Sequence, residues 1–235
     1  MIVKKILMSF AAAVFVLSSL LFLLFTDVQL VAFDRSYYVK QYEKYEVPSR
    51  LSMTMEELMN STEKLLLYME GRRDNLDFKA FMGGEEREFF SQRDKLHMVD
   101  VKELFSKGRL LRNLAAAYMV IFVLLFFSFK KSSKAIGRFG IWLSCTGLLP
   151  VLVLILLMYS DFNRYFTIFH EIFFTNDLWL LDPKADTLVN IFPESFFADT
   201  AYRIGCLYIL ELVVIFSCSI IYILYKKRKY RGNVQ

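Results

Sequence analysis

Cysteine, histidine and proline are scarce in this chain, which has three, two and four of them among its 235 residues. The cysteines, Cys145, Cys206 and Cys218, all lie within apolar runs, so a framework of structural disulfides is not expected. With two histidines and neither an HExxH motif nor paired cysteines, the signal for a metal site is weak, and we expect no metal. A GxSxG elbow, a P-loop and a dinucleotide fingerprint are also lacking, and with them the sequence signals of those enzyme classes.

Long apolar runs are abundant instead. Hydrophobic residues make up 56% of the chain, 24 residues are phenylalanine, and the mean hydropathy is +0.38. Such apolarity, gathered in runs, is typical of an integral membrane protein. Each run has about the twenty residues that a helix needs to cross a bilayer, and we expect transmembrane helices at residues 1–26, 111–129, 139–159 and 201–225. The first run is longer than the apolar part of a usual signal peptide, which favours an uncleaved anchor.

Basic residues indicate how these helices cross the membrane. Lys4 and Lys5, the loop 130–138 and the tail 226–235 include no acidic residue. By the positive-inside rule all three belong in the cytoplasm. We therefore expect a multi-pass protein of the cell membrane with both termini in the cytoplasm. The net charge of +5 reflects this topology, and no basic outer patch suggests nucleic acid as a partner.

Almost every acidic residue lies in the two remaining segments, 27–110 and 160–200, which this topology places outside. The first is too long for a connector and is expected to form a cap. The second is expected to be a loop that completes a site between cap and membrane. The predicted fold class is an all-α integral membrane protein with four transmembrane helices and an extracellular, mainly helical cap.

Local signals divide the cap further. Thr54 and Glu57 have the spacing of a capping box, so a helix should begin there, and Gly71 should end it. Gly83–Gly84 predicts a turn. We expect a further helix from Glu85 onward, leading to the second span.

The two histidines, His97 and His170, both lie at predicted outer membrane boundaries. Spans two and three are antiparallel neighbours joined by a short loop, so their outer ends, and with them the histidines, should be close. Imidazole can take and give a proton near neutral pH, which makes the pair a candidate for acid–base catalysis. A purely structural, hydrogen-bonded role is the alternative for each ring.

Four polar residues near the histidines have both a functional and a structural interpretation. Asp100 could orient His97, or it could simply begin the helix leading into the membrane. Asn176 and Asp177 could orient an imidazole or bind a substrate ammonium, or they could cap the short turn that follows. Asp182 has the same functional alternative, but it precedes a proline, which is a common turn arrangement.

Aromatic residues surround His170 in the sequence. Phe173, Phe174 and Trp179 are most economically explained as an interfacial aromatic belt. A pocket for acyl chains would use the same rings.

The fourth span has two further polar residues of interest. Asp199 is placed to cap it after Pro193 has opened a turn of helix. Glu211 lies about ten residues into the span, where a carboxylate is costly and a functional suspect. Pairing with a polar group of a neighbouring span is its structural alternative, and its role stays open.

Three motifs carry a resemblance to a known family. HMVDVKELF at 97–105, HEIFFTNDLWLLDP at 170–183 and IFPESFF at 191–197 resemble the lipoprotein intramolecular transacylases of Gram-positive bacteria. The similarity covers nearly the whole chain, with four spans and an extracellular cap after the first. In that family two histidines at the junction of cap and membrane are catalytic, and by motif they correspond to His97 and His170.

The resemblance implies an acyltransferase that acts within one substrate molecule. A diacylglyceryl lipoprotein in the outer leaflet would have its sn-2 acyl chain moved to the α-amino group of its N-terminal cysteine, giving the lyso-form. The implied enzyme needs no cofactor, has its active site on the extracellular face, contacts membrane lipid and is expected to be a monomer. The base stays open, with His170 favoured by its denser polar surroundings, and activity should fall as the pH drops through about 6.5.

Two other classes compete with this hypothesis. A metal-dependent membrane hydrolase of lipids or peptides would lose activity to chelators and release free fatty acid. A non-enzymatic membrane assembly partner would tolerate substitution of both histidines.

Overall fold

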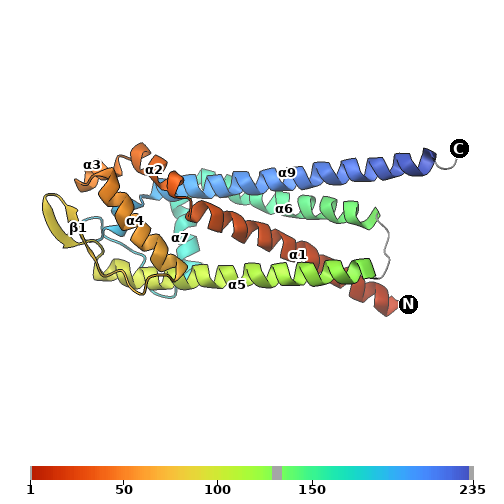
Figure 1. The fold of residues 1–235 in the computed structure, drawn as a ribbon, viewed down its shortest axis with the longest axis horizontal. Coiled ribbons are helices and arrows are strands. Elements are labelled where there is room, and N and C mark those ends of the chain that lie inside the picture. Colours follow the sequence, from red (N-terminus) through yellow and green to blue (C-terminus); the bar gives the residue numbers. More distant parts are fainter. Residues whose placement is uncertain (1, 129–133, 233–235) are drawn as a thin grey trace. The chain divides into compact units, whose positions relative to one another are not determined.

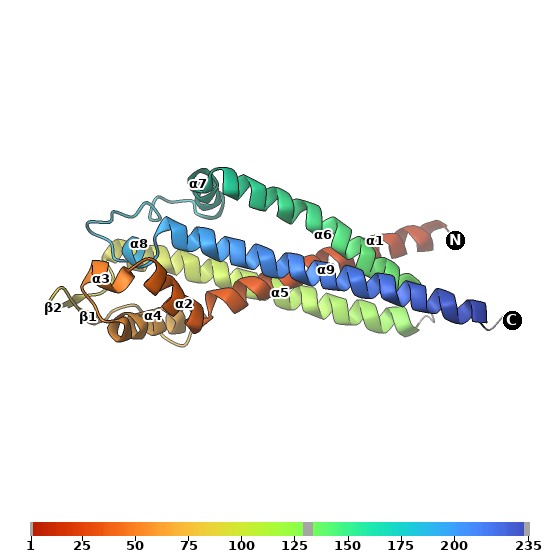
Figure 2. The ribbon, with the colours of Figure 1, turned by 90° about the horizontal axis from the view of Figure 1, so that it is seen from above.

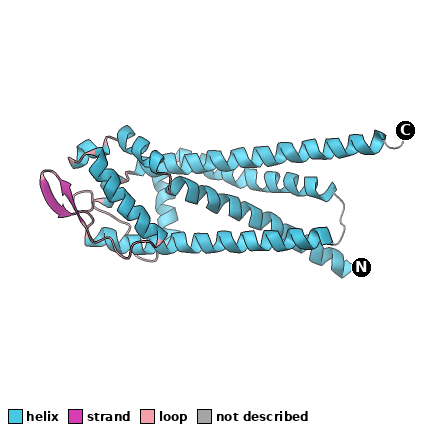
Figure 3. Ribbon diagram, viewed as in Figure 1, coloured by secondary structure: helices cyan, strands magenta, loops and turns pink. Residues whose placement is uncertain are grey.

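The computed structural model describes residues 2–128 and 134–232, and helices dominate it (Figure 3). The longest helices are α1, α5, α6 and α9, which Figure 1 labels. Their bounds are Ile2–Ala32, Gln92–Ser128, Lys134–Ser160 and Glu194–Gly232. These four helices are long and apolar enough to cross a membrane. The predicted class of a multi-pass, all-α membrane protein is therefore confirmed, although each helix extends beyond the span expected for it.

The chain divides into two compact units. The spanning unit comprises residues 1–28, 109–156 and 203–235, and the histidine unit comprises residues 29–108 and 157–202. Both histidines and every candidate residue that the sequence places around them belong to the histidine unit.

Close helix packing at small residues characterises the spanning unit. A Cβ atom on Gly140 of α6 would lie 1.8 Å from the Oγ of Ser219 on α9. The Ser144 hydroxyl donates to the carbonyl of Leu212 on α9 at 2.8 Å, and the Tyr118 hydroxyl of α5 donates to the carbonyl of Ala11 on α1 at 2.9 Å. Small residues that let backbones approach are how helices pack where no hydrophobic force drives them together.

The first turns of α5 are too charged to cross a membrane. Between Gln92 and Arg109 this helix carries many ionisable side chains: Arg93, Asp94, Lys95, Asp100, Lys102, Glu103, Lys107 and Arg109. The apolar part of α5 follows this stretch. His97 therefore lies on the helix but outside its membrane-spanning segment.

The histidine unit begins with three helices and a hairpin, labelled in Figures 1 and 2. Helices α2 (Arg35–Lys44), α3 (Val47–Leu51) and α4 (Met55–Glu70) precede strands β1 (Lys79–Met82) and β2 (Glu85–Glu88). The expected capping box at Thr54 and the helix end at Gly71 are both present. Helix α2 packs against α3 and α4, and α4 packs against β1.

The helix expected from Glu85 onward is a wrong prediction. Gly83 and Gly84 have φ angles of 63° and 89°, and Met82 pairs directly with Glu85. Two consecutive positive φ values form the tight turn whose twist suits an antiparallel hairpin. The chain therefore turns back as β2, and α5 begins only at Gln92.

Two predicted helix caps are also wrong, because both helices begin earlier. Helix α5 starts after Ser91, whose hydroxyl accepts from the Asp94 backbone while the Asp94 carboxylate accepts from the Ser91 backbone, each at 3.0 Å. Asp100 is therefore interior to α5. Helix α9 starts at Glu194, directly after Pro193, and Asp199 within it binds Lys44 and Tyr45 of the same unit.

The second half of the histidine unit contains α7 (Phe162–Phe173) and the short α8 (Leu188–Ile191), and α8 packs against α3. Aromatic rings join the residues that follow α8 to α2. Phe192 stacks on Tyr42 with a centroid distance of 6.2 Å, and Phe196 lies 5.6 Å from Tyr38. The Tyr42 ring is fully buried, and its hydroxyl bonds to that of Thr62 on α4 at 2.7 Å. This core holds the end of the segment that follows α7.

Candidate active site

His97 and His170 lie face to face within the histidine unit. His97 is one turn into α5 and His170 is near the end of α7, and their ring centroids are 6.1 Å apart with 32° between the ring planes. Both side chains are buried, with 6% and 7% of their surface exposed. The convergence expected from the order of the spans is thus present in the fold.

One hydrogen bond determines the tautomer of His170. Its Nδ1 lies 2.7 Å from the carbonyl oxygen of Phe166, one turn earlier on α7. A carbonyl oxygen can only accept, so Nδ1 carries the proton. The neutral ring then has its lone pair on Nε2, which is the form that a general base needs.

Aromatic rings enclose the pair. The His170 ring lies 4.3 Å from Phe166, 4.9 Å from Trp179 and 5.5 Å from Phe174, measured between centroids. Phe174 also contacts His97 at 5.2 Å, so one buried ring touches both imidazoles. Phe173 differs, because it is half-exposed and its ring packs on that of Phe169.

Burial makes both imidazoles harder to protonate. It lowers the pKa of His97 to about 4, and the nearby His170 ring and Arg93 act in the same direction while Asp100 opposes them. Burial also lowers the pKa of His170, partly offset by the Phe166 carbonyl. Both rings are therefore neutral at pH 7, and loss of the base is expected below the value of about 6.5 that the sequence suggested.

The segment from Phe174 to Leu181 is tied to α5 on both sides of His97. Arg93 donates through Nη2 to the Asp177 carbonyl and lies 3.7 Å from the Asp177 carboxylate. The amide of Asn176 donates to the Asp100 carboxylate at 2.8 Å. Asp100 therefore holds this segment, while His97 Nδ1 is buried and has no hydrogen-bond partner among the described residues. Asn176 also accepts from the Leu178 backbone, as its alternative role as a cap predicts.

Asp182 has the structural role that its proline neighbour suggested. Its carboxylate accepts from the Lys184 backbone at 2.9 Å, and its own backbone donates to Asp186 at 2.7 Å. Asp186 in turn accepts from the Ser91 hydroxyl at 2.6 Å. A hydrogen-bonded turn thus connects this segment to the start of α5.

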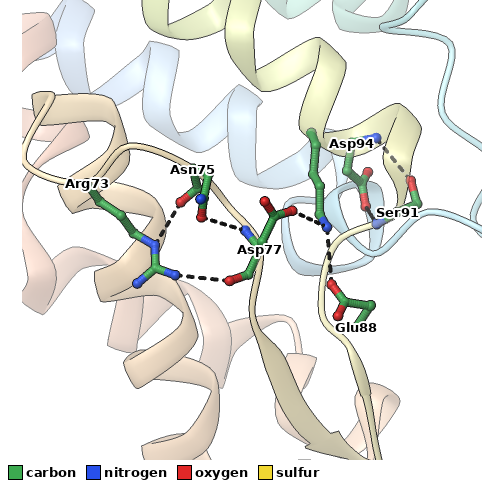
Figure 4. Close-up of polar contacts among 7 residues, drawn as sticks. Arg73, Asn75, Asp77, Glu88, Ser91 and Asp94 are labelled. Carbon is green, nitrogen blue, oxygen red and sulfur yellow. Dashed lines mark hydrogen bonds and ion pairs between the residues drawn. The ribbon is translucent and has the colours of Figure 1, made fainter.

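Asp94 anchors the same region and was missed by sequence reasoning. It is fully buried and accepts from the backbones of Ser91, Thr187 and Leu188. Figure 4 shows the Ser91–Asp94 pair beside the chain that leads into the hairpin, where Lys95 bridges Asp77 and Glu88. The spacing of Ser91 and Asp94, which matches a capping box with a shorter acid, was the available signal.

Glu211 belongs to the spanning unit, together with a second acidic residue, Asp27 of α1. The two carboxyl groups interact electrostatically with each other and with Tyr208 of α9. Asp27 Oδ2 and Glu211 Oε2 are buried and have no hydrogen-bond partner among the described residues.

Arg93 and Phe166 are further residues of the site that sequence reasoning missed. Each lies four positions before a histidine, which places it on the same helix face. Within residues 2–128 and 134–232, no group of three or more His, Cys, Asp or Glu side chains could hold a metal ion. The site therefore offers two neutral imidazoles beside aromatic rings: His170 has its acceptor nitrogen at Nε2, and His97 Nδ1 has no hydrogen-bond partner among the described residues. Such a site is suited to moving a proton beside an apolar substrate.

Comparisons with known proteins point in one direction. The profile of the family described as lipoprotein intramolecular transacylase Lit matches residues 13–197. No curated protein sequence matches the chain at a significant level.

Solved structures with the same fold come from Bacillus cereus. Two are single-residue variants of the membrane integral lipoprotein intramolecular transacylase Lit, each with a TM-score of 0.76 and 21% identity. The alignments cover 97% and 96% of this chain, and 96% and 97% of those chains. A third structure of that protein has a TM-score of 0.72 and 22% identity, over 94% of this chain and 97% of that one.

Proposed function

Since the chain belongs to the lipoprotein intramolecular transacylase family, and is thus a membrane acyltransferase that acts on lipoproteins, we propose that it makes lyso-form lipoproteins by catalysis at His97 and His170. It moves the sn-2 acyl chain of a diacylglyceryl lipoprotein to the α-amino group of the N-terminal cysteine. The observation that carries this proposal is the pair of buried imidazoles with ring centroids 6.1 Å apart.

His170 is the base in this mechanism. The neutral amine attacks the ester carbonyl carbon, a C–N bond forms, and the bond from that carbon to the glyceryl oxygen breaks. His170 Nε2 takes the proton from the attacking nitrogen, because Nδ1 is committed to Phe166. The proton then passes to the departing glyceryl oxygen, to which His97 donates a hydrogen bond. No acyl-enzyme forms, and the proton released by the amine is the one that the glycerol gains.

Orientation is the main contribution of the rest of the site. Amine and ester belong to one molecule, and holding them in reach of each other can contribute on the order of 7–11 kcal/mol to lowering the barrier. Phe166, Phe174 and Trp179 form walls beside His170. These walls keep water from competing with the amine, which favours transfer over hydrolysis.

Alanine substitution of each histidine tests the function. His97→Ala and His170→Ala are expected to lower conversion of a diacyl lipoprotein by at least about 10²-fold, the usual contribution of acid–base catalysis. Mass spectrometry of the N-terminal lipopeptide from membranes measures which atom carries the acyl chain. Glu171→Gln, an exposed neighbour of His170, is the matched control and should convert normally. Near-normal conversion by either histidine variant, or release of free fatty acid by the wild-type protein, would overturn the proposal.

We also propose that the histidine unit lies outside the cell, that both termini are cytoplasmic and that the enzyme is a monomer working in the outer leaflet. The basic loop and tail support this orientation through the positive-inside rule. A cysteine placed at the exposed Asp74 should react with a membrane-impermeant maleimide on intact cells. Labelling only after lysis would show that the histidine unit lies on the cytoplasmic side.

A further inference from the structure

We propose that Arg93 is a further catalytic residue, whose guanidinium Nε–H donates to the carbonyl oxygen of the acyl ester and stabilises the negative charge that develops there. This inference rests on the proposed function, because it states how that site carries the oxyanion. Attack by the amine converts the carbonyl carbon to a tetrahedral centre with a charged oxygen. Stabilising such an oxygen is usually among the largest contributions to acyl-transfer catalysis.

The helix places Arg93 beside the reacting groups. Arg93, His97 and Asp100 lie at positions i, i+4 and i+7 of α5, so they share one helix face. Arg93 is close enough to His97 to act on its ring electrostatically. The segment that carries Trp179 crosses this same face, since Asp177 binds Arg93 and Asn176 binds Asp100. Arg93 therefore lies on the face of α5 that contacts the segment carrying Trp179.

The two ends of the guanidinium have different surroundings. Nη2 is held by the Asp177 carbonyl and carboxylate, and 38% of the Arg93 side-chain surface is exposed. Nε is buried and has no hydrogen-bond partner among residues 2–128 and 134–232. A buried N–H group without an acceptor is costly, and a carbonyl oxygen of the substrate would supply the acceptor. Anchoring through Nη2 keeps Nε in place before the substrate arrives, which is the preorganisation that oxyanion stabilisation requires.

Several other donors around the site have a partner or an assigned role, since His97 donates to the departing glyceryl oxygen in the proposed mechanism. His170 donates to Phe166, and the Asn176 amide donates to Asp100. Lys95 binds Asp77 and Glu88, and Lys102 lies 4.0 Å from the centre of the Tyr68 ring. Arg93 is the cation on the His97 face that combines a permanent charge with an uncommitted N–H. It keeps its proton throughout, so the proton transfers assigned to His170 are unchanged.

Steady-state kinetics of Arg93→Gln and Arg93→Lys test this role. The probe is a synthetic diacylglyceryl-cysteine peptide with a free α-amine, presented to the full-length enzyme in lipid–detergent bicelles. Removing one oxyanion donor typically costs 10²–10³ in kcat, so Arg93→Gln should lose about that much while KM changes less than about threefold. Arg93→Lys keeps a cation for the Asp177 carbonyl but has no Nε–H, and its kcat should remain at least about tenfold below wild type. Arg72→Gln, at an exposed arginine paired with Glu70, is the matched control.

Trp179 reports whether the substitutions merely loosen the segment that Arg93 holds. The chain has two tryptophans, so in a Trp142→Phe background the emission comes from Trp179 alone. Unchanged emission together with a loss confined to kcat supports the proposal. A kcat of Arg93→Gln within threefold of wild type, a loss confined to KM, full recovery in Arg93→Lys, or a shift of the Trp179 emission in step with the loss would each overturn it. If the wild-type enzyme itself makes no lyso-form, the proposed function fails, and this outcome is distinct from all of these.

Discussion

Buried carboxylates are treated in opposite ways by the two units. In the histidine unit, Asp94 accepts three backbone N–H groups and Asp186 accepts from Ser91 and Asp182. In the spanning unit, Asp27 and Glu211 interact electrostatically, and each has a buried oxygen with no hydrogen-bond partner among the described residues. Backbone donors are free in loops and at helix starts, whereas a long helix uses its own N–H groups internally. Buried carboxylates can therefore stabilise the histidine unit, whereas the spanning unit depends on close packing of its helices.

The exposed surfaces show the same contrast. Large apolar side chains of the spanning unit are open to the surroundings, among them Leu124 and Leu156, which are 63% and 66% exposed. Lipid replaces water there, so exposure of leucine costs nothing and helix contacts depend on small residues such as Gly140. Aromatic rings such as Tyr42 and Phe192 are buried in the histidine unit. Substitutions should therefore destabilise the two units for different reasons: lost hydrogen bonds in the histidine unit and overpacking in the spanning unit.

The largest effect is expected at Asp94. Asp94→Ala leaves the backbones of Ser91, Thr187 and Leu188 without their acceptor and should lower the free energy of unfolding by about 2–4 kcal/mol. Thermal or denaturant unfolding of the purified protein in the Trp142→Phe background, followed by Trp179 emission, measures the change. Asp74→Ala at an exposed position should stay within about 0.5 kcal/mol of wild type. Equal stability of the two variants would show that the carboxylate does not hold this region.

A smaller effect is expected from overpacking the spanning unit. Gly140→Val places a side chain where a Cβ atom alone would meet Ser219 at 1.8 Å, and should destabilise the protein by about 1–3 kcal/mol. Gly205→Ala is the milder comparison, because its Cβ meets the flexible end of Ile155 at 2.7 Å. Unfolding titrations in detergent rank the two. The packing contrast fails if Gly205→Ala proves the more damaging substitution.

The smallest effect is a dependence on pH carried by the two imidazoles. Burial lowers the pKa of His170 and of His97 in the folded protein, so the unfolded chain binds protons below pH 6.5 that the folded chain does not. Stability should therefore decrease as the pH falls from about 6.5 towards the folded-state values, and stay level above that window. The acid midpoint of activity should likewise lie below 6.5. An activity midpoint at or above pH 6.5 would show that the rings are not buried in solution. As a control, substituting both histidines with glutamine should remove the pH dependence of stability.

Helix periodicity and short spacings predicted much of this molecule. Thr54 with Glu57, Gly71, and the four long apolar runs each encode hydrogen bonds or burial within a few residues, so the sequence is sufficient to locate them. The start of α5 was missed because a helix was expected from Glu85 onward and the spacing of Ser91 and Asp94 was not recognised as a cap. The hairpin was missed because four polar residues after Gly84 carry no alternation of apolar and polar side chains. Only pairing with β1 makes them a strand.

The candidate site was predictable in its members but not in its connections. The topology brought His97 towards His170, and the aromatic residues near His170 were visible in the sequence. Their individual contacts were not: Phe174 touches both rings, whereas Phe173 is half-exposed. Phe173 is the last residue of α7 and Phe174 is the extended residue that follows it, so the difference depends on where the helix ends, which the sequence did not show.

By itself the sequence determined that this is a membrane protein of a transacylase family, with four long apolar runs and two histidines near one another. Those properties follow from hydropathy, charge and motif, which act locally along the chain. The tertiary structure alone decided that His170 donates to Phe166, that Arg93 reaches Asp177, and that Asp94 supports residues 187 and 188. Arg93–Asp177 and Asp94–Thr187 join positions more than eighty residues apart, and such bonds exist only once packing has brought the partners within hydrogen-bond distance.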